Sequence, residues 1–307
     1  MGSGQPPLSV LSLPQSRSSP ECIDNTAATR HRCSFLINLH EREFERTGGD
    51  TKWLRGLKYV DEPKILYLDD INRVLAHQPW LCDGEYITGL VQGDVRIHWS
   101  LHDLALAVII LSHTHALCSF VHGVGGVYPS QMLDFQKEFG YVDFAARKDR
   151  AKTFKIHEFT WDHGFSLLND LVPESAQNLD EKFELTQRLT YSFMGGYENV
   201  DTTVYRNAVW NYIHALFGIR HDDYDYAKVN TLLSRDMKTF VKTAACFPHR
   251  ITEDMRESVM KDFKMSEKVR CGLLTTRCMV WSILMYKYNL PGTHTHVPYV
   301  SAAAFVY

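Results

Sequence analysis

The sequence lacks the features that would place it in several large classes of protein. Its formal net charge at pH 7 is only −3, from 33 basic and 36 acidic residues, so charge favours neither nucleic acid nor a membrane surface as a partner. The first 21 residues hold no basic segment and no long apolar run, which predicts no signal peptide. The longest apolar run, at residues 104–111, is too short to cross a bilayer.

The cysteines also form no recognisable motif. The seven cysteines are odd in number and scattered, and no two of them form a CxxC motif. This spacing argues against a disulfide framework and against a zinc module, and it favours the reduced thiols of a cytoplasmic or nuclear protein. The positions are Cys22, Cys33, Cys82, Cys118, Cys246, Cys271 and Cys278.

Strand-like alternation of apolar and polar residues is missing, whereas helical spacing is frequent, so the sequence predicts an all-α fold. The main helices are expected at residues 25–47, 100–123, 173–195, 202–217, 224–247 and 252–288. Ser100 is a good N-cap, with Asp103 three residues later in a capping-box-like position. The helix that follows is apolar nearly all round and should form the buried centre of the first half.

The chain divides by composition into five parts. Residues 1–24 are rich in serine, proline and glycine and predict a disordered tail. Residues 25–126 form a first helical half, 127–153 a linker, 154–290 a second helical half with the candidate sites described below, and 291–307 an irregular tail. Each half has one long apolar helix flanked by amphipathic ones, which suggests two similar bundles packed together.

Cys33 and His40 form a candidate thiol site. They are seven residues apart on one helical face, and the rise of roughly 10 Å over that distance disfavours a direct thiolate–imidazole pair. His31 and Arg32 could lower the pKa of the thiol, but no second cysteine stands at a spacing suited to resolve a sulfenic acid. The alternative is a small buried cysteine and a surface or interface histidine.

Several histidines gather between positions 98 and 122. His98 and His102 have the i,i+4 spacing that could hold a metal, but the N-cap Ser100 lies between them and no acidic residue completes a ligand set. With His113, His115 and His122 they are interpreted as core or cap residues, and we predict neither a metal nor a cofactor.

Arg206 and Glu267 suggest a pocket for a free amino acid. Arg206 stands one turn into a helix among apolar residues, where a guanidinium either reaches water or meets an anion. An arginine for the carboxylate and a glutamate for the ammonium would hold both ends of an amino acid by charge-assisted bonds. An ordinary salt bridge between helices is the alternative.

The segment HDDYDY at residues 221–226 follows Gly218 and enters a helix. Its carboxylates suit the positive end of that helix, so capping explains part of the cluster. Three carboxylates with two tyrosines exceed what a cap needs and predict an exposed recognition patch. Arg235, Lys238 and Lys242 then lie along one face of the following helix, which alone would be a solvated basic stripe.

Several long strings resemble the sestrin family over residues 29–288. They include TRHRCSFLINLHEREFERTGGDTKWLRGL, INRVLAHQPWL, HEFTWDHGFSLL and VDTTVYRNAVWNYIHALFGIRHDDYDY. The resemblance implies an all-α protein whose two halves resemble each other and the alkylhydroperoxidase AhpD. It also implies restraint of the TOR kinase complex through GATOR subcomplex two, leucine sensing in some members, and an antioxidant activity of the first half. The chain begins closer to the family's cysteine than relatives do, so the preceding helices are expected to be shortened.

The resemblance also assigns roles to individual residues. Family members that sense leucine match this chain at Thr190, Tyr191, Thr202, Arg206 and Glu267. Three pocket positions depart, with Phe193 for a threonine, Tyr205 for a leucine and Met260 for a tryptophan. The family's GATOR-binding positions match Ser100, Asp222, Asp223, Tyr224, Arg235, Lys238 and Lys242.

Three functions are compared on these grounds. The leading one is a non-enzymatic stress- or nutrient-responsive regulator that restrains TOR signalling through GATOR and responds to leucine or another amino acid. The second is an AhpD-like thiol reductase of alkyl hydroperoxides or peroxiredoxins that uses Cys33. It is disfavoured because the family's relay tyrosine is Phe35 here, which carries no proton. The third is a bare helical scaffold, which the retained Arg206 and Glu267 disfavour.

Overall fold

The computed structural model describes residues 20–82, 84–92, 99–126, 154–156, 161–188 and 194–259, together with Lys261, Glu267 and Gly272. Within these residues the fold is all-α, as predicted, apart from one pair of short strands. The first helices are α1 (Pro20–Arg30), α2 (Ser34–Arg46), α3 (Pro63–His77), α4 (Gly84–Gln92) and α5 (Leu101–Gly123). They are followed by α6 (Trp161–Leu171), α7 (Pro173–Arg188), α8 (Thr203–Leu216), α9 (Ala227–Leu232), α10 (Arg235–Cys246) and α11 (Glu253–Ser258). The strands are β1 (Phe154–Ile156) and β2 (Ile219–His221).

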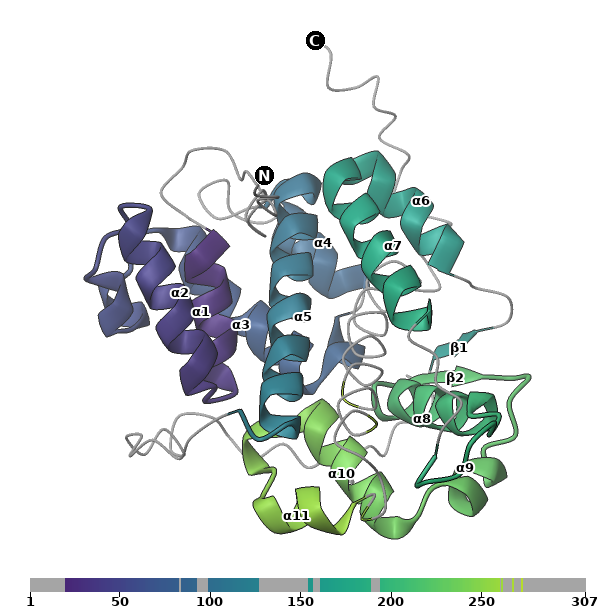
Figure 1. The fold of residues 1–307 in the computed structure, drawn as a ribbon. Helices are drawn as coiled ribbons and strands as arrows, with labels where there is room; N and C mark the ends of the chain where they lie inside the picture. The colour runs from purple at the N-terminus through teal and green to yellow at the C-terminus, as the bar shows by residue number, and fades with distance from the viewer. Residues whose placement is uncertain are drawn as a thin grey trace, which may run out of the picture.

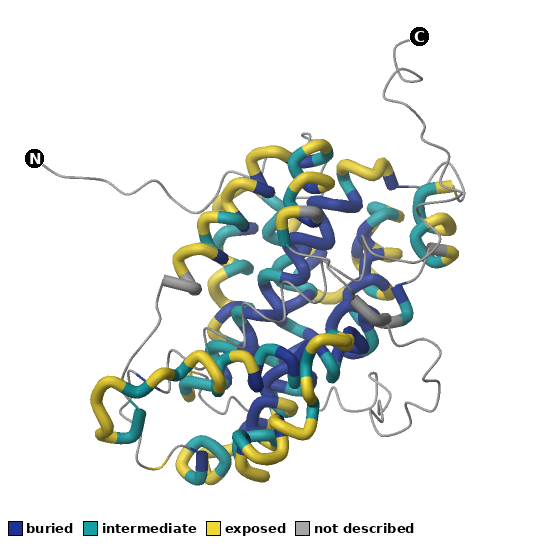
Figure 2. The backbone as a smooth tube through the Cα atoms, turned by 90° about the vertical axis from the view of Figure 1, so that its right-hand side faces the viewer, coloured by how far each residue is buried: buried dark blue, intermediate teal, exposed yellow. Residues whose placement is uncertain are grey.

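Helix α5 is the centre around which the described helices pack. It contacts α1, α3, α6 and α10, and Figure 1 shows it running through the middle of the molecule. Its predicted N-cap is confirmed, because the Ser100 Oγ accepts a hydrogen bond of 3.0 Å from the backbone N–H of Asp103. By length and hydropathy α5 would also suit a membrane span, but 78% of that window is buried inside the protein, as in a core helix. In Figure 2 the buried backbone gathers at the centre and the exposed residues lie on the outer helices.

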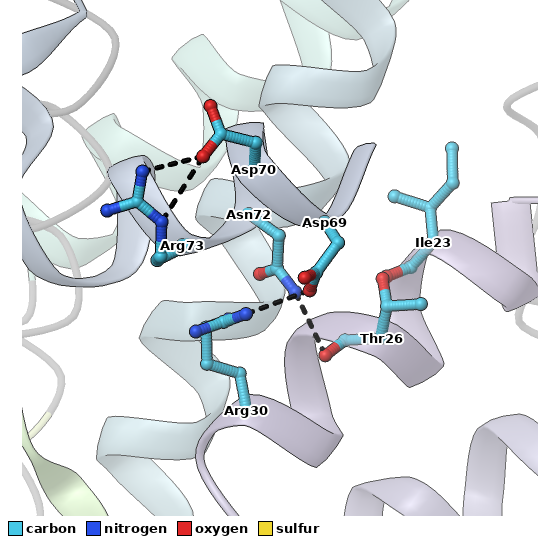
Figure 3. Close-up of polar contacts among 7 residues, drawn as sticks. All are labelled: Ile23, Thr26, Arg30, Asp69, Asp70, Asn72 and Arg73. Atoms are coloured by element: carbon cyan, nitrogen blue, oxygen red, sulfur yellow. Dashed lines mark hydrogen bonds and ion pairs between the residues drawn. The ribbon is translucent and has the colours of Figure 1, made fainter. Parts of the chain in front are cut away.

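Polar contacts fix α1 against α3 (Figure 3). The Arg30 guanidinium donates to the Asp69 carboxylate at 2.8 Å, although the arginine side chain is only 2% exposed. The Asn72 amide donates to the backbone carbonyl of Thr26 at 3.1 Å. Because buried polar groups are costly to leave unpaired, these bonds set the position of the end of α1, which leads directly into the candidate thiol site.

The helix predicted at residues 25–47 is two helices. The first begins at Pro20, inside the predicted disordered tail, and ends at Arg30. Arg32 then adopts a left-handed backbone conformation with φ of 52°, and Cys33 becomes the N-cap position of α2. The backbone N–H of Cys33 bonds to the Ala28 carbonyl at 3.0 Å, which closes the turn between the helices.

Two further predicted helices are also interrupted. The one expected at 224–247 divides into α9 and α10, because Leu233 is extended and the Ser234 side chain caps α10 by accepting from the N–H of Met237 at 3.1 Å. Thr252 caps α11 in the same way, and α11 ends at Ser258, where the next residue is extended. Most of the remainder of the helix predicted to residue 288 lies outside the described residues. The break before α10 follows from a local hydrogen bond that competes with the helix.

The helix predicted at 173–195 and the strand content also differ from expectation. Helix α7 ends at Arg188, and Met194 pairs with Tyr197 in a tight antiparallel turn. Strands β1 and β2 pair in parallel, with Phe154 opposite Ile219 and Ile156 opposite His221. This pairing joins the segment before α6 to the start of the 221–226 loop. The predicted linker at 127–153 and the tail at 291–307 lie outside the described residues, and the two-bundle division stays a prediction.

Candidate functional site

The Cys33 thiol lies at the N-terminus of α2, not within a helix as the sequence predicted. Its side chain is fully buried and packs in one small cluster with Cys118, which comes from the C-terminal part of α5. The pKa of Cys33 is lowered, chiefly by the neighbouring Cys118 thiol and against the opposing effect of burial.

Cys118 is the residue that sequence reasoning missed. Its side chain is fully buried and packs with Cys33, Ala28 and Leu36 in a small apolar cluster. Burial and the neighbouring Cys33 thiol raise the pKa of Cys118, so Cys118 carries the proton of the pair. The sequence showed no cysteine at a spacing suited to resolve a sulfenic acid at Cys33, because this contact joins two distant segments that no local spacing reveals.

His40 of α2 and Asp24 of α1 lie close to each other where α1, α2 and α5 pack together. The His40 Nδ1 is 3.8 Å from the Asp24 carboxylate, which also accepts a hydrogen bond from the Thr114 hydroxyl. Burial raises the pKa of Asp24 to about 7, and the Asp24 charge contributes to the raised pKa of Cys118. Burial lowers the pKa of His40. Phe35, at the position of the family's relay tyrosine, is 57% exposed.

The histidines predicted as core or cap residues lie mostly in the core. His31, which was expected to act on Cys33, instead packs edge to face against His115 and His77, with ring centroids 4.8 and 5.7 Å away. The His122 Nε2 lies 2.9 Å from the backbone oxygen of His31, and His113 lies 3.3 Å from the Lys182 ammonium. His102 is exposed in the first turn of α5, and His98 lies outside the described residues.

The candidate amino-acid pocket is described in part. Arg206 is half-buried and donates to the Thr203 hydroxyl at 3.0 Å, while its buried Nε has no hydrogen-bond acceptor among the described residues. Glu267 is 7% exposed, so its carboxylate is also removed from bulk water. Thr202 is the N-cap residue of α8, and Tyr205 is half-buried. Thr190, Tyr191, Phe193 and Met260 lie outside the described residues, and the pocket stays a prediction.

The acidic-aromatic loop at residues 221–226 follows directly from β2. Asp222 and Asp223 are exposed, whereas Asp225 caps α9 by accepting from the N–H of Ala227 at 3.0 Å. Tyr224 and Tyr226 are half-buried and meet edge to face at 5.3 Å. The loop therefore has a fixed aromatic base with two carboxylates on its outer side.

The basic face of α10 is formed by Arg235, Lys238 and Lys242. Arg235 and Lys242 are exposed, and the Lys238 ammonium bonds to the Asn230 side chain at 2.8 Å. Spacings of three and four residues place the three cations on one side of the helix.

Ser100 is exposed but lies at the other end of α5 from α10. Phe240 of α10 packs beside Gly123, the last residue of α5, and that helix has 23 residues. At about 1.5 Å per residue, the two ends of α5 are roughly 34 Å apart. Figure 1 shows this separation along α5. The predicted partner-binding residues therefore form two surfaces and not one compact patch.

The profile of the family described as PA26 p53-induced protein (sestrin) matches residues 18–134 and 127–290 of the chain. The chain belongs to the sestrin family. Sestrin-2 of Homo sapiens is 34% identical to it over 354 aligned positions, which cover 85% of this chain and 73% of that protein. Sestrin-3 of Mus musculus is 34% identical with 85% and 75% covered, and Sestrin-1 of Macaca fascicularis is 32% identical with 85% and 73% covered. The membership supports a sestrin-type stress-responsive protein with the all-α sestrin fold.

Proposed function

We propose that this sestrin restrains TOR signalling by binding GATOR subcomplex two through the 221–226 loop and the basic face of α10. The observation that carries the proposal is the arrangement of the loop. Its tyrosines are packed at the base while Asp222 and Asp223 are exposed, so the carboxylates meet a partner without a large ordering cost. Exposed aromatic and charged side chains on a rigid support are typical of recognition sites.

The neighbouring elements support a bipartite footprint. The loop offers negative charge, whereas the face of Arg235, Lys238 and Lys242 offers positive charge, and a partner that binds both must carry complementary charge of each sign. Ser100, roughly 34 Å away along α5, would contact a different part of a large partner. A multi-subunit assembly fits such a separation better than a small protein does.

The proposal is tested by co-precipitation of GATOR subcomplex two with the double variant Asp222→Lys/Asp223→Lys. We expect binding to be lost, since charge reversal places like charges across the interface. The matched control is Asp170→Lys/Glu181→Lys, which makes the same change in charge at exposed positions of α6 and α7. Retained binding by the loop variant, or equal loss in the control, would reject the assignment.

Amino-acid gating belongs to the same proposal. Arg206 and Glu267 would hold the carboxylate and the ammonium of leucine or another amino acid, with Thr190, Tyr191 and Thr202 around it. The support is the buried Nε of Arg206, which has no acceptor among the described residues, and the low exposure of Glu267. Binding of the amino acid would then alter the affinity for the partner.

Thiol chemistry at Cys33 is the second candidate function. The place of Cys33 at the N-terminus of α2 and the neighbouring Cys118 thiol lower its pKa and favour the nucleophilic thiolate, which supports reduction of hydroperoxides in an AhpD-like manner. The exposed Phe35 supplies no proton relay, so turnover is expected to be slow. Consumption of a hydroperoxide by the wild type, with loss in Cys33→Ser, is the test. An unchanged rate in that variant would remove the candidate.

A further inference from the structure

Two thiols from segments far apart in the sequence meet inside the protein. Cys33 is the N-cap residue of α2 and Cys118 stands in the C-terminal part of α5, and the two side chains pack in one small cluster. Both side chains are 0% exposed, and their shared neighbours Ala28 and Leu36 are apolar. Two thiols packed together in this way can be joined by a disulfide once an oxidant takes two electrons from them.

We propose that Cys33 and Cys118 are a redox pair that closes reversibly into a disulfide between the start of α2 and the C-terminal part of α5. The two thiols have different roles because their surroundings differ. Cys33 stands at the N-terminus of α2, where the helix dipole favours a thiolate, so it is the attacking sulfur. Cys118, buried and near the Asp24 carboxylate, keeps its proton and is the resolving sulfur.

The chemistry balances with a small hydroperoxide as the oxidant. The Cys33 thiolate attacks one peroxide oxygen, the O–O bond breaks, and the other oxygen leaves as an alcohol after taking a proton. Cys33 is then a sulfenic acid, oxidised by two electrons. The Cys118 sulfur attacks it, the S–O bond breaks, and hydroxide leaves with the thiol proton as water. Two equivalents of an external thiol restore both cysteines and are themselves oxidised to a disulfide.

Closure of the bond joins two segments that already pack together. Cys33 and Cys118 belong to the same small cluster of buried residues, with Ala28 and Leu36, so the thiols are neighbours in the folded chain before oxidation. The turn at Arg32, with its left-handed backbone, holds Cys33 in this position at the end of α1. The bond would tie α2 to the core helix α5, so oxidation would change the rigidity of the first half of the chain.

The first step, reaction of Cys33 with a peroxide, rests on the second candidate function. The experiment tests that reaction and the formation of the disulfide separately. The reduced full-length chain is treated with one equivalent of hydrogen peroxide, or separately with the thiol oxidant diamide. Free thiols are then alkylated in denaturant and the unreduced digest is analysed by mass spectrometry. We expect one linked pair of peptides containing Cys33 and Cys118 after either oxidant, with the remaining cysteines alkylated and the link removed by a phosphine reductant.

Variants test the separate roles. In Cys118→Ser, hydrogen peroxide should leave Cys33 as a sulfenic acid that dimedone captures, or carry it on to the sulfinic acid. Cys22→Ser is the matched control, because Cys22 is also buried and stands in α1, but packs in the main core and not with the pair. It should form the Cys33–Cys118 link as the wild type does.

The outcomes distinguish the proposal from hydroperoxide reduction. A link formed by diamide and not by hydrogen peroxide would support the pair and reject peroxide chemistry at Cys33. Full alkylation of both cysteines after both oxidants in the folded wild type would overturn the pair, whatever the hydroperoxide turnover. A link from Cys33 to any other cysteine would overturn it as well.

Discussion

The imidazole rings of His31 and His115 meet edge to face with their centroids 4.8 Å apart, and both side chains are fully buried. His77 lies beside them, its Nδ1 3.2 Å from the backbone oxygen of Cys246. Burial lowers the pKa of all three rings, and the positive charge of Arg30 adds to this effect at His77 and His115. The centre of the fold therefore requires these histidines to be neutral.

Acidification is expected to destabilise the protein. Burial lowers the pKa of His77 to about 3 and that of His113 to about 4, from 6.5 in the unfolded chain. Between these values the unfolded chain binds more protons than the folded chain. The contribution of these two histidines to stability is therefore complete above pH 6.5 and is lost as the pH falls. At pH 5 the loss for His77 alone is about 2 kcal/mol. Urea unfolding at pH 7.5, 6.5 and 5 would measure this loss.

A pair of variants isolates the contribution of His77. His77→Gln removes the titrating group and should make the fall in stability between pH 7.5 and pH 5 smaller. His102→Gln changes an exposed histidine and should leave that fall unchanged. An identical dependence on pH in His77→Gln and the wild type would contradict the assignment.

Asp24 should have the opposite dependence on pH. Burial raises its pKa to about 7, so the folded chain binds a proton that the unfolded chain has released. Its contribution to stability is present below pH 3.8 and is lost as the pH rises through 7. Asp24→Asn keeps an acceptor for Thr114 and should raise the melting temperature more at pH 8.5 than at pH 5.5. An equal change at the two pH values would rule out the buried carboxyl as the cause.

Local patterns in the sequence were sufficient to predict the caps and most of the helices. Ser100 followed by Asp103 marks the start of α5, and Thr252 marks the start of α11, because a capping side chain bonds to a backbone N–H only three residues away. Ser234 caps α10 in the same way, through the N–H of Met237 three residues later. The apolar stripe through 224–247 obscured it, since side-chain spacing continues across a break in the helix.

Contacts between distant segments were not predictable in this way. The contact between Cys33 and Cys118 depends on how α1 and α2 pack on α5, and the start of α2 depends on the left-handed conformation of Arg32. The parallel pairing of β1 with β2 likewise joins segments that have three residues each, too short for alternation to be seen. The family resemblance indicated Cys33 as reactive, but Cys118 emerged only from the folded chain.

Gly49 is expected to be intolerant of any side chain. A Cβ at this position would lie 2.4 Å from the ring of Phe44, a fully buried core residue, so the ring must move. We expect Gly49→Ala to cost about 1–3 kcal/mol in the free energy of unfolding. Gly48→Ala is the comparison, since Gly48 has open space but a φ of 83°, and should cost about 1 kcal/mol from backbone strain alone. A smaller effect at Gly49 than at Gly48 in urea unfolding would contradict the packing.

Amino-acid binding at Arg206 is expected to be visible as a thermal shift. A ligand at ten times its dissociation constant adds about 1.4 kcal/mol of stability, which for a chain of this size raises the melting temperature by roughly 2 °C. Arg206→Met should abolish the shift by removing the carboxylate partner. Arg46→Gln changes an exposed arginine that pairs only with Glu43 among the described residues, and should keep the shift. Absence of any shift with all free amino acids at millimolar concentration would reject the pocket.

The choice of amino acid depends on the residues that depart from the leucine-sensing pattern. Tyr205 is half-buried beside Arg206 and adds bulk where the leucine-sensing relatives have a leucine. Tyr205→Leu should therefore increase the shift caused by leucine relative to that caused by a smaller amino acid such as alanine, because it enlarges the space for the ligand side chain. The ratio of the two shifts is the measurement, and Tyr212→Leu on the same helix, further from Arg206, is the control. An equal ratio in the wild type and Tyr205→Leu would show that this tyrosine does not limit the choice of ligand.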